Sequence, residues 1–282
     1  MKKTLFLLLL CVLTAPFVRA QYEEIGIQVG VTNYKGELSE HLFNTDFIHP
    51  FGGLFFRHNW NRHWSWKVEL NYGKISGDDS KADNGFELDR NLSFHSNILE
   101  LSPQLEFNFF PYETGNLAYP FTPFVFGGIS VFRFNPKAEL NGDVYELQPL
   151  GTEGQGTNNN KKYKRIQIAI PFGGGVKWTV SERIGMGIEV GARRTYTDYL
   201  DDVSTVYPDL NLLLAANGAA AVALSDRSFS SRDTSNSSYV FRNQRGNSKD
   251  KDWFLFAGIT IYFRLNSMIK DSCKPFKKRN YH

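Results

Sequence analysis

Cysteine is scarce in this 282-residue chain, which contains only Cys11 and Cys273. Cys11 lies inside the first apolar stretch, so two cysteines cannot form a disulfide framework in the body of the protein. The chain is therefore not a small secreted domain held together by disulfides.

Long apolar runs are also absent beyond residue 20. Lys2 and Lys3 precede an apolar segment at positions 5–13, and small residues stand at positions 18 and 20. This order predicts a signal peptide over residues 1–20. Because Cys11 does not follow a cleavage site, the pattern does not indicate a lipoprotein. No later window holds 18 apolar residues, so we expect no membrane-spanning helix and place the chain outside the cytoplasm.

The chain beyond the signal peptide also lacks an excess of either positive or negative charge. The formal charge of the whole chain is +3, and Lys2, Lys3 and Arg19 of the signal peptide supply it, which leaves 3 − 3 = 0 for the remainder. A nucleic-acid surface is therefore not indicated. The mean hydropathy of −0.35 suits a membrane barrel, in which only alternate strand residues contact lipid.

What the chain does contain is strict alternation of apolar and polar residues, clearest over residues 164–194. In the first arm Ile166, Ile168, Ile170 and Phe172 occupy every second position, and small or charged residues lie between them. The second arm, from Ile184, repeats the pattern around Gly185, Gly187 and Glu189. Successive side chains of a strand point to opposite faces, so each arm has an apolar face and a polar face. Arms of this length are typical of a membrane β-hairpin.

Six further segments complete the pattern and make eight strands in all. The eight strands lie near residues 22–31, 51–60, 64–73, 92–109, 121–134, 164–180, 184–194 and 253–265. Connections alternate strictly between short and long, which predicts an all-β fold: an eight-stranded antiparallel transmembrane β-barrel of the outer-membrane type with long extracellular loops. Residues 21–265 would form this barrel, with both termini in the periplasm. A soluble sandwich or lipocalin-like barrel stays as the alternative.

Two strands are irregular. Leu92 and Phe94 are out of phase with Leu99 and Leu101, which predicts a bulge near Ile98. Residues 121–134 are apolar at nearly every position, so their facing cannot be assigned. Within the last long connection, residues 210–224 predict one helix or two short ones.

The polar faces carry charges that would lie inside the barrel. The interior of eight strands is about wide enough for side chains alone. We expect paired charges to fill it, from Arg57, Lys67, Glu69, Glu100, Glu106, Lys177, Glu189, Arg193 and Arg264. A structural network of ion pairs is the main interpretation, and a proton or ion path is the alternative.

Catalytic and metal-binding patterns are weak. His95 and Ser96 superficially resemble the pair of outer-membrane lipid A deacylases, but adjacent strand residues point to opposite faces and form no dyad. We expect no enzyme and no cofactor, with a lipid A-modifying enzyme as a remote alternative. Asp198, Asp201 and Asp202 crowd the loop after residue 194. They either cap turns or contribute to a Ca²⁺ site, and both interpretations stay open.

The C-terminal segment, residues 266–282, is basic. Lys274, Lys277, Lys278 and Arg279 surround Cys273, the one cysteine outside the signal peptide. A lone thiol in an oxidising compartment indicates either pairing with another protein or an unpaired tail cysteine. We expect a periplasmic tail that tethers a partner, with a disulfide through Cys273 as one form of the tether.

Several blocks resemble a known family. Residues 92–112, 146–156, 168–178, 193–209 and 244–254 are similar to the PorG-type outer-membrane barrels of Bacteroidetes. The resemblance implies a non-enzymatic accessory barrel of the type IX secretion system, in some members shared with gliding motility. Its partners would be outer-membrane lipid and lipopolysaccharide, and periplasmic ring proteins of the PorK and PorN type. A surface adhesion or envelope-structure barrel is the alternative function.

Overall fold

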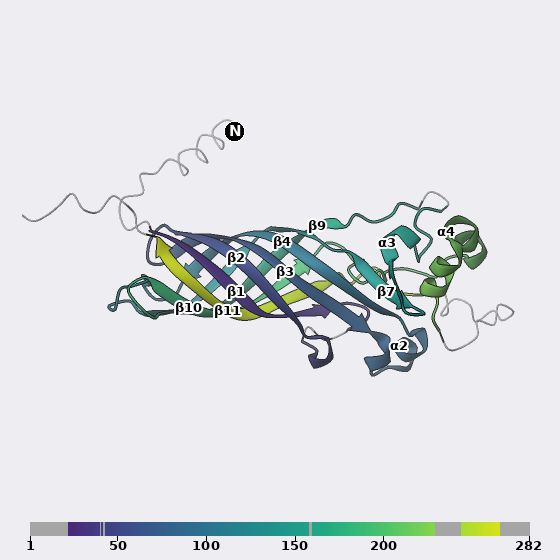
Figure 1. Ribbon diagram of the computed structural model, residues 1–282, viewed down its shortest axis with the longest axis horizontal. Helices are drawn as coiled ribbons and strands as arrows, with labels where there is room; N and C mark the ends of the chain where they lie inside the picture. Colours follow the sequence, from purple (N-terminus) through teal and green to yellow (C-terminus); the bar gives the residue numbers. More distant parts are fainter. Residues whose placement is uncertain (1–21, 40, 42, 158–159, 229–243, 266–282) are drawn as a thin grey trace, which may run out of the picture.

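The chain folds into an elongated barrel with a cap of loops at one end (Figure 1). The computed structural model describes residues 22–39, 41, 43–157, 160–228 and 244–265. The barrel strands are β1 Tyr22–Lys35, β2 His49–Asn59, β3 Trp64–Asp78, β4 Ser93–Asn108, β5 Phe121–Gly128, β6 Ser130–Arg133, β9 Ile166–Thr179, β10 Ile184–Thr195 and β11 Trp253–Leu265.

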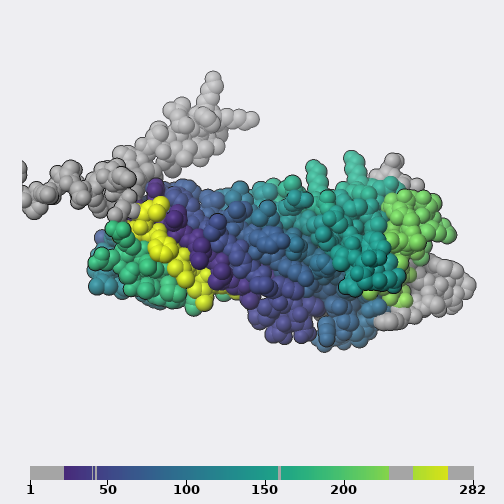
Figure 2. Space-filling model, in the orientation of Figure 1, coloured from purple at the N-terminus to yellow at the C-terminus, as the bar shows by residue number. Residues whose placement is uncertain are grey.

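These strands close into a ring. The order is β3-β2-β1-β11-β10-β9-β5-β4, and β4 pairs with β3 to complete the circle. β6 continues β5 between β4 and β9, so β5 and β6 fill one of eight positions. The seam between the first and last strands is visible where yellow β11 lies against purple β1 (Figure 2). The prediction of an eight-stranded antiparallel barrel is confirmed, since the ring of eight positions closes on itself.

The outer surface of the ring is apolar along its middle. The exposed side chains there are Ile25, Ile27, Val29, Leu54, Leu70, Leu99, Leu101, Leu105, Val125, Val131, Ile168, Ile170, Ile188, Val190 and Ile259. Side chains at the intervening positions point inward, as strand geometry requires. In β5 and β6 the inward residues are Thr122, Phe124, Phe126, Ser130 and Phe132, which supplies the facing that the sequence left open.

The expected bulge near Ile98 is wrong. β4 pairs with β3 without interruption, with Asn97, Ile98 and Leu99 opposite Lys74, Gly73 and Tyr72. Phe94 and Ile98 are buried because the barrel interior itself changes character along its axis. Near the long loops it is an apolar core, in which Tyr34, Ile75, Phe132 and Phe254 join Phe94 and Ile98.

The connections separate into two ends. The short turns after β2, β4 and β9 lie at the end where β1 begins and β11 finishes, which we call the short-turn end. There the 109–120 turn folds back into the barrel: the Tyr112 hydroxyl lies 2.8 Å from that of Tyr262, and the Thr114 hydroxyl bonds to Glu24. This turn closes the barrel mouth.

The opposite, long-loop end carries all the remaining elements (Figure 1). They are η1 Thr45–Phe47, η2 Asp79–Lys81, α2 Gly85–Arg90, the hairpin of β7 Pro136–Leu140 and β8 Asp143–Glu146, α3 Leu147–Leu150 and α4 Leu210–Ser225. The predicted helix near 210–224 is confirmed as α4. Asp209 caps its N-terminus, and it kinks at Gly218, whose φ is 84°.

Candidate functional site

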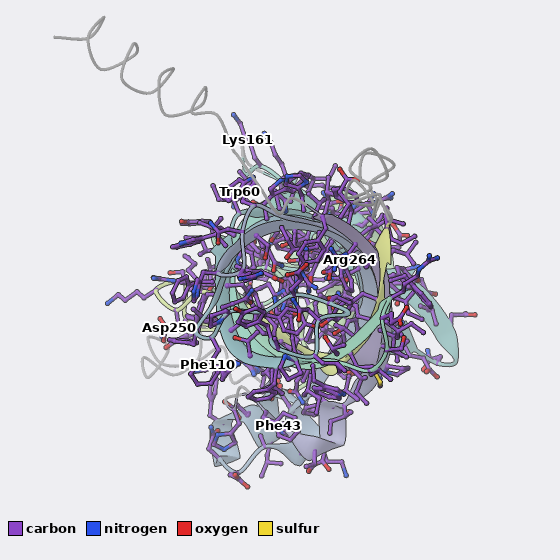
Figure 3. The ribbon with its side chains drawn as sticks, turned by 90° about the vertical axis from the view of Figure 1, so that its left-hand side faces the viewer. Phe43, Trp60, Phe110, Lys161, Asp250 and Arg264 are labelled. Atoms are coloured by element: carbon purple, nitrogen blue, oxygen red, sulfur yellow. The ribbon has the colours of Figure 1, made fainter. Side chains whose placement is uncertain are left out.

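The middle of the barrel holds an interlocked set of charges. Nine inward side chains from six strands take part, and none is more than 6% exposed. They are Glu24, Arg57, Lys67, Glu69, Glu100, Glu106, Lys177, Glu189 and Arg193. Figure 3 looks along the barrel from the short-turn end and shows the ring filled with side chains. We call these nine residues the lumen network.

Lys67 is the centre of the lumen network. Its Nζ lies 2.6 Å from Glu69, 3.0 Å from Glu106 and 2.7 Å from Glu189. Glu106 is also held by Arg57 at 2.9 Å and by Lys177 at 2.8 Å. Lys67 and Glu106 thus join groups on β2, β3, β4, β9 and β10. Each charge lies against at least one of opposite sign, which a buried charge in a low dielectric requires.

Further inward charges extend the lumen network along the barrel axis towards both ends. Arg57 donates to Glu24 at 2.8 Å, towards the short-turn end. Arg193 lies 3.3 Å from Glu100, on the side of the long loops. Four cations and five carboxylates therefore bridge the strands by ion pairs.

Aromatic rings fill the space between these charges. Lys177 Nζ lies 4.4 Å from the ring centre of Phe124, and Arg193 lies 4.6 Å from that of Phe256. Such cation–π contacts add attraction where water is excluded. Glycines on neighbouring strands make room for the rings. A Cβ on Gly185 would lie 2.2 Å from the ring of Tyr262.

The structure brings together eight of the nine charges expected in the lumen and leaves one apart. Arg264 lies at the short-turn end, where it donates to the carbonyl of Thr114 at 2.7 Å and pairs with Glu113 at 3.2 Å. Glu24, absent from the predicted set, belongs to the lumen network. Its inward position in the alternation of residues 22–31 was the available signal.

The acidic residues of the long loop do not form one group. Both oxygens of Asp202 accept hydrogen bonds, from the hydroxyls of Thr152 and Tyr163. Asp198 accepts from Ser204 at 2.6 Å and lies 4.0 Å from Lys251. Burial raises the pKa of Asp198 and of Asp202 to about 6. Asp202 therefore serves the internal packing of the loops.

Asp201 instead meets two carboxylates that sequence reasoning missed, Glu37 and Asp252. One oxygen of each lies within 4.8 Å of the others. We call these three residues the acidic triad. Burial raises the pKa of Asp201 to about 7, and burial together with Asp201 raises the pKa of Asp252 well above its ordinary value. The signal was topological: β1 and β11 pair up to Lys35 and Trp253, so closing the ring brings Glu37 near Asp252.

The residues of the weak catalytic pattern do not combine. Ser96 points inward, where its hydroxyl accepts a hydrogen bond from the Asn135 amide at 2.9 Å. His95 pairs with Ser76 and Lys137 on neighbouring strands and lies on the opposite face of β4. These contacts give Ser96 a structural partner in place of a catalytic base.

The basic tail, with Cys273, Lys274, Lys277, Lys278 and Arg279, lies outside the described residues, as does the expected signal peptide. Among the described residues, no helix combines the length and apolar character needed to cross a bilayer. The closed ring with its apolar outer band is the architecture of an outer-membrane β-barrel.

A family model described as "Domain of unknown function (DUF6089)" matches residues 2–217. None of the curated proteins matches the chain. Among solved structures, the chain is similar to the N-terminal barrel domain of Pseudomonas aeruginosa OprF. The identity is 9%, the match covers 87% of this chain and 97% of that domain, and the TM-score is 0.36. The chain is also similar to the attachment invasion locus protein Ail of Yersinia pestis, at 8% identity, with 88% of this chain and 100% of Ail covered and a TM-score of 0.41. A third similar structure is Neisserial surface protein A, at 6% identity, with 88% of this chain and 100% of that protein covered and a TM-score of 0.44.

Proposed function

Because the chain belongs to the DUF6089 family, whose function is unknown, we propose its role from its geometry: a non-enzymatic, non-conducting outer-membrane barrel that anchors a protein secretion machine. The filled lumen supports the non-conducting part of this proposal. Nine charged side chains occupy the barrel interior and are at most 6% exposed. A barrel of eight strands has about enough interior for side chains alone, so such packing leaves no water-filled path.

Conductance tests this observation directly. The full-length mature barrel is reconstituted into planar bilayers at neutral pH and held at both polarities. We expect no steady single-channel steps, because an ion entering the lumen would have to break several buried ion pairs. Reproducible, ion-selective steps would overturn a non-conducting role.

If nothing passes through the lumen, the protein must act through contacts at the two ends of the barrel. We infer that the short-turn end faces the periplasm, since outer-membrane barrels keep their short turns and termini there. Its surface has an open groove of about 780 Å³ lined by Asn61, Arg62, His63, Trp64, Phe107, Pro111 and Tyr119. Beside it, at the tip of the 109–120 turn, Leu117 is 86% exposed. A protruding apolar side chain at a turn tip suits a protein contact.

The partner proposed for this end is a periplasmic ring of the PorK and PorN type, in a type IX secretion system. The support is the sequence resemblance to PorG-type barrels in blocks such as residues 168–178 and 193–209. The basic tail around Cys273 would add charge, or a disulfide, to the same contact. Loss of the barrel should then abolish surface display of cargo with C-terminal sorting domains. Normal display after gene deletion would contradict the secretion role.

Site-specific photo-crosslinking tests the contact itself. A photoreactive residue replaces Leu117 at the short-turn end, and in a matched control it replaces Phe43, which is 56% exposed at the long-loop end. We expect adducts with ring proteins from position 117 and none from position 43. No ring adduct from position 117, in cells that secrete normally, would remove the docking proposal.

A surface adhesion role is the second candidate. It is favoured by α4 at the long-loop end, which exposes Leu212 and Leu214. The double substitution Leu212→Asp and Leu214→Asp distinguishes the two functions. Lost attachment with intact secretion favours adhesion, whereas unchanged attachment leaves the anchor role.

A further inference from the structure

We propose that the acidic triad, Glu37, Asp201 and Asp252, binds one hard divalent cation, Ca²⁺ being the best match, and thereby fastens two extracellular loops to each other. Glu37 follows β1, whereas Asp201 and Asp252 lie at the two ends of the connection between β10 and β11. Ca²⁺ takes oxygen ligands at about 2.3–2.6 Å, so opposite ligands stand about 4.6–5.2 Å apart. The three carboxylates fit within that span, since one oxygen of each lies within 4.8 Å of the others.

Asp252 and Glu37 each accept a backbone hydrogen bond through one oxygen, and Asp201 is held through both of its oxygens. Asp252 Oδ2 accepts the amide of Leu200 at 2.8 Å. Asp201 Oδ1 accepts the amide of Val203 at 2.9 Å, and Glu37 Oε1 accepts that of Asn247 at 3.2 Å. These bonds fix the side chains in place. Fixed carboxylates of like charge repel one another unless a cation or a shared proton lies between them.

The free oxygens supply the second observation. Asp252 is fully buried, and its Oδ1 has no hydrogen-bond donor within the described part of the chain. Oδ1 of Asp252 and the Tyr34 hydroxyl both lie within 2.3 Å of the place where a Cβ on Gly36 would stand. That hydroxyl donates to Asp201 Oδ2 at 2.5 Å. The unpartnered oxygen therefore points into the acidic triad. Glu37 Oε2 is likewise unpartnered.

Among the described residues, the neighbouring cations form their ion pairs with carboxylates outside the acidic triad. The Arg90 guanidinium donates hydrogen bonds to both oxygens of Asp79, at 2.7 and 2.8 Å, and to the backbone carbonyl of Glu37. Lys251 lies 4.0 Å from Asp198, a further carboxylate beside the acidic triad. Buried carboxylates without a paired cation are costly, and a divalent ion removes that cost.

An entry route reaches the acidic triad from outside. Glu37 and Gly36 line an open pocket of about 570 Å³ at the long-loop end, together with Asn247 and Asp250. A hydrated ion could reach Glu37 through this pocket and exchange its water for the buried oxygens. The remaining ligands of a six- to eight-coordinate Ca²⁺ would be backbone carbonyls and water.

Calorimetric titration of Ca²⁺ into the full-length mature barrel, refolded in detergent without lipopolysaccharide, tests the site. We expect one ion per chain and an affinity lowered about tenfold or more by Asp252→Asn, because loss of a charged ligand weakens Ca²⁺ binding. The matched control, Asp143→Asn on the exposed β8, should bind as the wild type does. Absence of one-to-one binding by the wild type would overturn the proposal, as would equal affinity of both variants.

Glu37→Gln is the second variant, used if Asp252→Asn does not fold. Protease susceptibility then reports the fastening of the loops. Saturating Ca²⁺ should slow cleavage of the long-loop end at least severalfold in the wild type and Asp143→Asn but not in Glu37→Gln. Equal Ca²⁺ protection in Glu37→Gln would place the ion elsewhere and refute this assignment.

Discussion

Lys67 and Glu189 stand on opposite sides of the ring, yet Lys67 Nζ lies 2.7 Å from Glu189 Oε2. β3 and β10 are four positions apart in either direction around the barrel. A direct contact between them means that two side chains cross the whole lumen. The charges therefore act as cross-struts that hold the barrel at a fixed width.

Removing the Lys67 charge should destabilise the barrel strongly. Lys67→Met leaves Glu69, Glu106 and Glu189 buried without their shared cation, which should cost about 3–5 kcal/mol of unfolding free energy. The double variant Lys67→Met, Glu189→Gln should lose less than the sum of its single changes, because the two groups interact. Urea unfolding of the refolded protein measures both. Glu23→Gln, on the outward face and 52% exposed, is the control, and a similar loss there would contradict the argument.

Glycine positions in the wall should differ sharply in their tolerance of a methyl group. Gly185→Ala drives a Cβ to 2.2 Å from the Tyr262 ring, which the Tyr112 hydroxyl holds in place. We expect a loss of about 1–3 kcal/mol from overpacking. Gly52→Ala is the matched control, since its Cβ would meet no atom closer than 3.9 Å. Thermal unfolding compares the two, and equal melting temperatures would show that the ring moves aside freely.

The strands could be predicted because each has one face towards lipid and one inward. That rule holds along residues 166–172, where Ile166, Ile168, Ile170 and Phe172 are exposed. It failed near Ile98, because the inward face there is apolar as well and two apolar faces look like a change of phase. The local sequence pattern of a bulge is the same as that of a strand whose inward face changes from polar to apolar.

The acidic triad shows a second limit. Asp201 was one of three crowded candidates, but Glu37 and Asp252 are distant in sequence and only ring closure brings them to it. Conversely, Asp198 and Asp202 looked like ligands and instead bond to Ser204, Thr152 and Tyr163. Local crowding of acidic residues did not predict which of them share a site, because the partners come from other loops.

Glu146 offers a pH test at the long-loop end. A hydrogen bond from Asn135 and an ion pair with Arg165, at 2.8 Å each, hold the pKa of its carboxyl below the ordinary 4.5. Because the folded pKa is depressed, the stabilisation is present above the unfolded pKa and is lost as pH falls through the folded value, below 4.5. A carboxyl-carbon NMR titration should show that low midpoint. Asn135→Ala should move it upward, and an unchanged midpoint would exclude the Asn135 bond as its cause.

Arg245 should hold the loops together without supporting the barrel. Its guanidinium donates to Glu153 at 3.0 Å and to the carbonyls of Asp202 and Ser225, so one buried side chain joins three loop segments. Arg245→Ala leaves Glu153 buried without its cation, which should cost about 3–5 kcal/mol. Among the described contacts, Arg245 has no bond to the lumen network. The loss should therefore destabilise the packed long loops, which can open while the barrel stays folded. Proteolysis of the long loops should therefore accelerate while the urea midpoint of the barrel strands stays unchanged. Lys161→Ala, an exposed loop substitution, should change neither. A parallel fall in the barrel midpoint in Arg245→Ala would mean instead that loops and barrel unfold as one cooperative unit.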